Sequence, residues 1–170
     1  KDVAVVISAS GNPKYLLGVL EKANEVNAKT IALTCNSQAK IIDEASLAIC
    51  VEVGPEVIAG SSRMKAGTAQ KMVLNMLTTG SMIKIGKTYE NFMIDLNPTN
   101  EKLKDRAIRI VAQIAETTHA NAFQTLENCN WEIKTAIVSI KMGIDFDTAR
   151  QKLKTCNGVL RRLLNKKEVI

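Results

Sequence analysis

The chain contains few aromatic residues and no long hydrophobic run. Only 4% of its 170 residues are Phe, Trp or Tyr, which leaves little material for stacking on nucleic-acid bases. No apolar segment reaches the ~20 residues needed to cross a bilayer, and no charged leader followed by an apolar segment opens the sequence. These absences argue against a nucleic-acid or membrane partner and favour a cytoplasmic protein.

Motifs for binding metals and nucleotides are also absent. The single histidine, His119, has no neighbouring Cys or second His, so nothing supports a metal or catalytic-triad role. No GxGxxG or Walker-type loop occurs. Four cysteines without CxxC spacing, each in an apolar or helical context, favour reduced structural thiols over disulfides or metal ligands: Cys35, Cys50, Cys129 and Cys156. We therefore expect no metal and no nucleotide cofactor.

The composition is that of a folded domain with a basic surface. Hydrophobic residues make up 46% of the chain, which is enough for a core, and the net charge is +6. The basic residues are mixed with acidic ones over most of the length, and only Arg161–Lys167 concentrates positive charge. A mixed basic surface of this kind is typical of solvated protein surfaces and also suits a phosphorylated substrate.

The first third of the chain alternates between strand and helix patterns. Short β-branched or apolar runs predict buried parallel strands over Val3–Ile7, Lys29–Cys35 and Leu47–Val53. Between them, apolar residues at helical spacing predict one helix that begins near Pro13 and a short one over Ala39–Ala45. This alternation indicates a parallel α/β sheet flanked by helices.

The remainder of the chain is predicted to be helical. A long helix is expected from about Ser62 to Ile85, and the strand signals stop beyond Gly86. Capping residues and apolar spacing then predict helices over Glu101–Glu116 (cap Asn100 or Thr99), Ala122–Asn128 (cap Asn121 or Thr118), Trp131–Met142, Asp147–Cys156 (cap Asp145) and Gly158–Asn165. We expect two domains, an α/β domain over residues 1–115 and a small all-helical C-terminal module over residues 116–170.

A candidate phosphate-binding loop follows the first predicted strand. Ser8, Ser10, Gly11 and Asn12 lie between that strand and the next helix, where open α/β sheets bind ligands beyond the carboxyl ends of their strands. Gly11 would let backbone N–H groups face an anion, and the serines offer hydroxyl donors. An ordinary strand-to-helix turn with a serine cap is the structural alternative.

A second candidate anion site lies at the start of the long helix. The cations Arg63 and Lys65 follow the hydroxyl groups of Ser61 and Ser62, and the helix N-terminus is expected to present unpaired N–H groups. Just before them, Glu56 stands in a Gly-Pro-Glu turn. Its carboxylate could accept hydrogen bonds from a sugar or exchange a proton, or it could simply cap the helix.

The sequence around this site resembles one family over nearly the whole chain. GPEVIAGSSRMKAGTAQK (Gly54–Lys71), continued through Val73–Val111, resembles the signature of N-acetylmuramic acid 6-phosphate etherases, which the glucokinase regulatory protein shares. Val3–Asn36 resembles the second half of a sugar isomerase (SIS) domain, and Asn130–Leu164 the small C-terminal helical module of the etherases. One departure is that etherases commonly have Arg-Thr where this chain has Asn12-Pro13, so a phosphate contact from that threonine is lost.

The resemblance implies a SIS-type parallel sheet, here partial, and a lyase. Such an enzyme cleaves the D-lactyl ether of N-acetylmuramic acid 6-phosphate during cell-wall sugar recycling, without a metal or organic cofactor. In the family the principal acid and base lie upstream of the matched region, so this chain looks like the C-terminal part of a longer protein. Glu56 is then a sugar contact and only a candidate catalytic residue.

A phosphosugar-sensing regulatory protein is the alternative function. The glucokinase regulatory protein shares the long signature and has no etherase activity, although it is much longer. In either case the expected partner is a phosphorylated amino sugar or a related phosphosugar. The Met-rich segment Lys71–Ile85 offers more apolar surface than this part of a sheet could cover, so we also expect a homodimer.

Overall fold

The computed structural model describes residues 2–164. The chain forms two compact units, Lys1–Thr78 and Thr79–Ile170, and the division falls within one long helix. We describe each unit separately. None of the described helices combines the length and the hydropathy that a membrane span requires.

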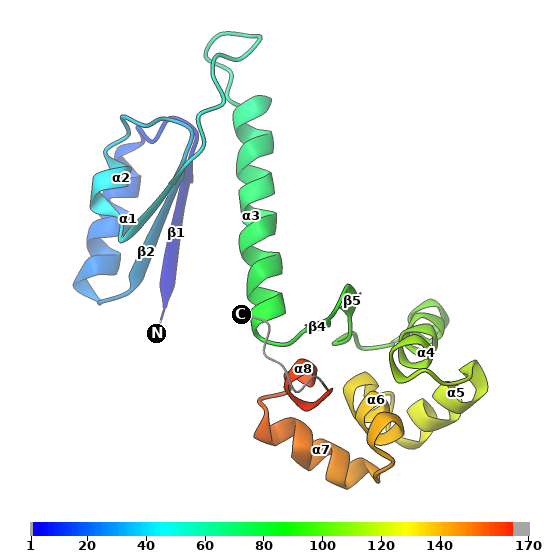
Figure 1. Ribbon diagram of the computed structural model, residues 1–170. Helices are drawn as coiled ribbons and strands as arrows, with labels where there is room; N and C mark the ends of the chain where they lie inside the picture. The colour runs from blue at the N-terminus through cyan, green and yellow to red at the C-terminus, as the bar shows by residue number, and fades with distance from the viewer. Residues whose placement is uncertain (1, 165–170) are drawn as a thin grey trace. The chain divides into compact units, whose positions relative to one another are not determined.

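The first unit contains a three-stranded parallel sheet of order β1-β2-β3 (Figure 1). The strands are β1 (Val3–Ser8), β2 (Lys29–Thr34) and β3 (Leu47–Cys50). Helices α1 (Lys14–Glu25) and α2 (Ile41–Glu44) pack on one face of the sheet. Their shared core consists of Val6, Leu16, Leu20, Ala32, Ala39 and Ile41. The predicted β-α-β-α-β order and parallel sheet are confirmed.

Burial in the sheet differs from the sequence prediction. Only β2 is largely buried, whereas β1 alternates, with Val6 3% exposed and Val5 42% exposed. Side chains alternate between the faces of a strand, so the face that carries Val3, Val5 and Ile7 is the one that α1 and α2 do not cover. The prediction that this apolar run is a buried strand is therefore wrong for one of its two faces.

The long helix α3 (Lys65–Lys84) begins three residues later than predicted and spans 20 residues. Ala66 is its one buried residue. Its methionines are exposed, with Met72 at 51% and Met76 at 64%, as is Ile83 at 51%. The apolar residues of α3 therefore contribute almost nothing to the cores of the described chain.

In the second unit, the end of α3 is followed by a hairpin that the sequence did not predict. Strands β4 (Thr88–Tyr89) and β5 (Phe92–Met93) pair antiparallel, and Glu90 between them lies in the left-handed region at φ +51°. Two strands of two residues each are too short to produce an alternating hydrophobic pattern. The expectation that no strand follows Gly86 is corrected here.

Five helices complete the second unit: α4 (Glu101–Ala115), α5 (His119–Asn128), α6 (Ile133–Met142), α7 (Phe146–Thr155) and α8 (Leu160–Leu164) (Figure 1). The caps decide between the sequence alternatives, because Asn100 accepts from the Leu103 N–H at 2.9 Å and Thr118 from the Asn121 N–H at 3.2 Å. Asp145 caps α7 as predicted. Helix α6 begins two residues later than predicted, because Asn130 and Trp131 both have positive φ.

One continuous core holds these helices together. It includes Ile94, Ala107, Val111, Leu126, Ile137 and Leu160, all at most 1% exposed. Trp131 packs against this core, with its ring 6.1 Å from that of Phe123. Helix α4 thus shares its core with the later helices, although we expected it in the first domain.

The predicted domain boundary at 115/116 stays a prediction about family modules, since the two compact units divide earlier, between Thr78 and Thr79. Of Arg161–Lys167, residues 165–167 lie outside the described chain, as does the predicted helix end at Asn165.

Candidate functional site

The loop after β1 turns sharply at Gly11, which has φ +67°. Its backbone is held by its own serines: the Gly11 N–H donates to Ser8 Oγ at 3.0 Å and the Asn12 N–H to Ser10 Oγ at 3.4 Å. Each hydroxyl therefore accepts one backbone hydrogen bond and keeps its own proton to donate. Such a loop can present two hydroxyl groups to a ligand at the carboxyl end of the strand.

Gly11 is required by packing as well as by its backbone angle. A Cβ at this position would lie 2.2 Å from Ala39 Cβ and 3.3 Å from Thr34 Oγ1. Ala39 is 3% exposed, so it has little room to yield. The loop consequently lies directly against the segment that follows β2, which is a closer approach than any side chain would permit.

The end of β2 and the segment after it contribute residues that the sequence analysis did not select. The Asn36 side chain donates from Nδ2 to the Ser10 carbonyl at 2.9 Å, and Thr34 Oγ1 donates to the Ala9 carbonyl at 3.3 Å. The Cys35 N–H donates to the same Ala9 carbonyl at 3.0 Å. The available signal was their place: polar residues at the carboxyl end of a buried parallel strand, or directly after it, lie at the same sheet edge as the loop after the neighbouring strand.

Glu56 caps α3 in this structure. Its carboxylate accepts the N–H of Lys65 at 3.0 Å and the N–H of Ala66 at 3.1 Å. The hydrogen bond from Lys65, then that from Ala66, lowers the pKa of Glu56 below its ordinary value. A carboxylate held in this way is ionised at neutral pH and is poorly suited to deliver a proton. The capping alternative is thus the one observed, while a sugar contact by Glu56 stays a prediction.

The start of α3 differs from the expected anion site. Besides the two N–H groups on Glu56, the Gly67 N–H donates to the Ser62 carbonyl and the Thr68 N–H to the Met64 carbonyl, each at 3.0 Å. The first four N–H groups of the helix are therefore engaged, and the prediction that they are unpaired is wrong. Binding of an anion here would depend on side chains.

Two cations at this helix start are available for that purpose. Arg63 and Lys65 are exposed, and neither forms an ion pair within the part of the chain that the structure describes. With Thr68 and Met72 they line a hollow of about 500 Å³. Ser61 and Ser62, which precede them, lie in the turn before the helix.

A chain of contacts joins the two candidate sites within the first unit. The loop after β1 contacts Asn36, the adjacent Cys35 Sγ lies 3.9 Å from the Ala66 carbonyl, and the Ala66 N–H is bound by Glu56. Burial, then the nearby Cys50 and Glu56, raises the pKa of Cys35, so its thiol is protonated. The arrangement gathers hydroxyl groups, an amide and cations near one sheet edge, which is chemistry for binding an anion.

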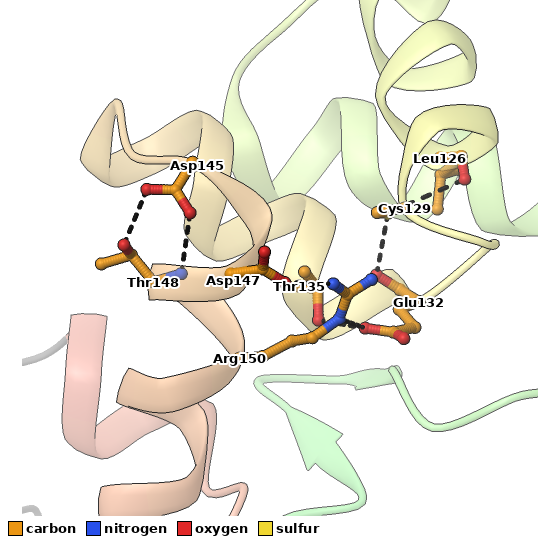
Figure 2. Close-up of polar contacts among 8 residues, drawn as sticks. All are labelled: Leu126, Cys129, Glu132, Thr135, Asp145, Asp147, Thr148 and Arg150. Atoms are coloured by element: carbon orange, nitrogen blue, oxygen red, sulfur yellow. Dashed lines mark hydrogen bonds and ion pairs between the residues drawn. The ribbon is translucent and has the colours of Figure 1, made fainter.

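A separate polar cluster lies in the helical unit beside a hollow of about 570 Å³. Figure 2 shows Arg150 reaching Glu132, with an Nε–Oε2 distance of 2.9 Å, while Thr135 donates to the same carboxylate. Burial raises the pKa of Glu132, but the hydrogen bonds from Arg150 and Thr135 outweigh burial and hold it below its ordinary value. Asp95 is likewise paired, with Lys87 and Lys134. These charges largely satisfy one another, as in a structural network.

Within residues 2–164 no group of three or more His, Cys, Asp or Glu side chains is arranged to hold a metal ion. All four cysteines are free thiols. The candidate site at the sheet edge therefore consists of the β1–α1 loop, the turn after β2 and the residues around the start of α3.

Comparison with known proteins shows two kinds of similarity, to a domain model and to curated relatives. Residues 1–80 match the SIS domain model. The chain is 47% identical over 168 residues to the N-acetylmuramic acid 6-phosphate etherase of Pseudoalteromonas atlantica, covering 99% of this chain and 55% of that protein. It is 49% identical to the etherase of Vibrio atlanticus, covering 95% of this chain and 53% of the relative. It is 47% identical to the etherase of Lactobacillus johnsonii, covering 97% of this chain and 55% of that relative.

The chain thus spans about half the length of the curated relatives it matches, and the matched half is their C-terminal part. The similarity is continuous across both compact units, because the alignments cover at least 95% of the chain. Over nearly its whole length, therefore, the chain is similar to the C-terminal half of N-acetylmuramic acid 6-phosphate etherases, and the parallel α/β fold of its first unit agrees with the SIS domain match.

Proposed function

We propose that the protein containing this chain is a lyase that cleaves the D-lactyl ether of N-acetylmuramic acid 6-phosphate. Its products are N-acetylglucosamine 6-phosphate and D-lactate, formed in the cytoplasm during recycling of cell-wall amino sugars. The observation that carries the proposal is the identity of 47–49% to proteins named as this etherase, over nearly all of the chain.

In this proposal the chain supplies contacts to the phosphosugar. The loop Ser8, Ser10, Gly11 and Asn12 receives the phosphate through its hydroxyl groups, and Arg63 and Lys65 add positive charge. Ser61 and Ser62 lie beside these cations and offer further hydroxyl groups. Asn12 stands where the family commonly has a cationic side chain. Of the loop residues, its exposed amide is therefore the one that we expect to change the substrate preference.

The elimination needs a base that removes the proton at C2 and an acid that protonates the ether oxygen as the C3–O bond breaks, followed by addition of water at C3. Glu56 is unsuited to be the acid, because two backbone N–H groups stabilise its ionised form. We therefore assign Glu56 a role in ordering the start of α3 beside the sugar. The principal acid and base belong to a part of the protein outside these residues.

We also propose that the protein is a homodimer in which part of α3 is buried. The exposure of Met72 at 51% and Met76 at 64% supports this, since such apolar side chains favour burial against another surface. Analytical ultracentrifugation of the whole protein is expected to give the mass of a dimer. A monomer at micromolar concentration would contradict the proposal.

The etherase assay tests the function directly. Purified whole protein is incubated with N-acetylmuramic acid 6-phosphate, and release of D-lactate and exchange of the C2 proton in deuterated solvent are measured. Glu56→Gln is expected to lower kcat/KM about 10- to 100-fold and to keep C2 exchange, because an ordering contact is lost and the base is not. Complete loss of exchange in a folded variant would make Glu56 the base. Binding of the phosphosugar without lactate release would instead support a regulatory protein.

A further inference from the structure

Asn36 holds the candidate phosphate loop with one end of its side chain and its own turn with the other. Nδ2 donates to the Ser10 carbonyl at 2.9 Å, across 26 residues of sequence, and Oδ1 accepts the Gln38 N–H at 3.0 Å. The Asn36 N–H donates to Thr34 Oγ1 at 3.2 Å, which fixes the residue to the end of β2. Both polar ends of the amide are thus used, and this also sets its orientation, since a flipped amide would lose both hydrogen bonds.

The contact with Ser10 controls the direction of the next N–H group. The Ser10–Gly11 peptide is planar and trans, so its carbonyl and its N–H point in opposite directions. Pinning the Ser10 carbonyl to Asn36 therefore turns the Gly11 N–H away from Asn36 and toward Ser8 Oγ, 3.0 Å away. A glycine could otherwise rotate this peptide freely, because it populates positive and negative φ about equally.

This orientation decides what Ser8 can offer to a ligand. Because Ser8 Oγ accepts from Gly11, its proton must point elsewhere, and this hydroxyl donates no hydrogen bond to another of the described residues. A bound oxyanion would complete a chain of hydrogen bonds that runs from Asn36 through the Ser10–Gly11 peptide to Ser8. Hydrogen bonds in such a chain polarise and strengthen one another.

We propose that Asn36 is a positioning residue that sets the phosphate affinity of the Ser8–Asn12 loop without touching the phosphate. The inference deepens the proposed function and rests on one part of it, that this loop binds a phosphate group. It predicts that removal of the Asn36 amide weakens binding of inorganic phosphate and raises KM for the phosphosugar, while kcat changes little.

The experiment compares four forms of the whole protein: wild type, Asn36→Ala, Asn36→Asp and the control Ser37→Ala. Asn36→Asp keeps an oxygen for the Gln38 N–H but loses the donor to Ser10, whereas Asn36→Ala adds no charge. Ser37→Ala removes a hydroxyl in the same turn that bonds Glu52 and does not contact the loop. For each form we measure the Kd for inorganic phosphate by calorimetry, kcat and KM for N-acetylmuramic acid 6-phosphate, and the thermal midpoint.

Both Asn36 variants are expected to weaken phosphate binding and raise KM about 10- to 100-fold, with kcat within about threefold of wild type and the control unchanged. An effect of Asn36→Asp alone would be that of the added charge and would refute the positioning role. The positioning role would also be refuted if both Asn36 variants lost kcat and had a lower thermal midpoint while their Kd for phosphate stayed at the wild-type value. That result would indicate a structural role only.

Failure of the proposed function gives a different result. If the wild type binds phosphate but releases no lactate, the etherase activity is refuted, while weakened phosphate binding by both Asn36 variants still supports the inference. If the wild type binds neither phosphate nor the phosphosugar, the loop is not a phosphate site and the role of Asn36 is refuted with it.

Discussion

Replacement of Gly11 by alanine tests the structure of the loop most directly. The added Cβ would lie 2.2 Å from Ala39 Cβ, although carbon atoms in contact lie about 3.5–4.0 Å apart, so the loop or the segment after β2 must shift. The residue must also keep φ near +67°, which costs an L-residue about 1–2 kcal/mol.

These contributions give the expected size of the effect. Overpacking of a tight site costs about 1–3 kcal/mol, and the stiffer unfolded chain returns about 0.4–1 kcal/mol. Gly11→Ala should therefore lower the free energy of unfolding by about 1–5 kcal/mol. Because the displaced loop carries Ser8 and Ser10, KM for the phosphosugar should rise as well.

The assay is urea unfolding of the whole protein, followed by circular dichroism, with the kinetics measured in parallel. Gly18 provides the control, because it lies within α1 and an added Cβ would meet nothing within 4 Å. Gly18→Ala should raise the free energy of unfolding by about 0.5–1 kcal/mol through better helix propensity. The reasoning is refuted if Gly11→Ala is as stable as wild type and retains its KM.

Three further predictions concern helix ends and one tight turn. The pKa of Glu56 is lowered in the folded state, so its contribution to stability is present above the unfolded pKa and is lost as the pH falls through the lowered folded value. The thermal midpoints of wild type and Glu56→Gln should therefore differ at pH 7 and converge in acid; a constant difference would contradict the capping argument. Gly86→Ala should destabilise the helical unit in urea unfolding more than Gly143→Ala, because both residues have positive φ but only at Gly86 would a Cβ meet backbone, at 2.9 Å. Asn100→Ala should cost about 1 kcal/mol in the same assay and Thr99→Ala close to nothing, since Asn100 is the observed cap of α4; equal losses would contradict this assignment.

Local features were predictable from the sequence wherever the physics is local. The β-branched run at Val3 and the apolar run at Lys29 predicted β1 and β2, and Asp145 predicted the start of α7, because periodicity and capping act within a few residues. The β4–β5 hairpin escaped because its strands are too short for any pattern. Asn36 was not predicted because its role depends on a hydrogen bond to Ser10, which lies 26 positions away in the sequence.

The sequence by itself determined the order of the strands β1 to β3 and of the helices, most helix starts and ends within a few residues, and the place of the Ser8–Asn12 loop after a strand. The similarity to the etherases also follows from the sequence, since it rests on identity along the chain. Only the tertiary structure decided that the Glu56 carboxylate accepts hydrogen bonds from two N–H groups of α3. It alone also decided that Ala39 leaves no room for a side chain at position 11, so that Gly11 is required there. The physical reason is that a donor, an acceptor or a cavity acquires its role from atoms that the folded chain brings next to it, and neither composition nor spacing specifies those neighbours.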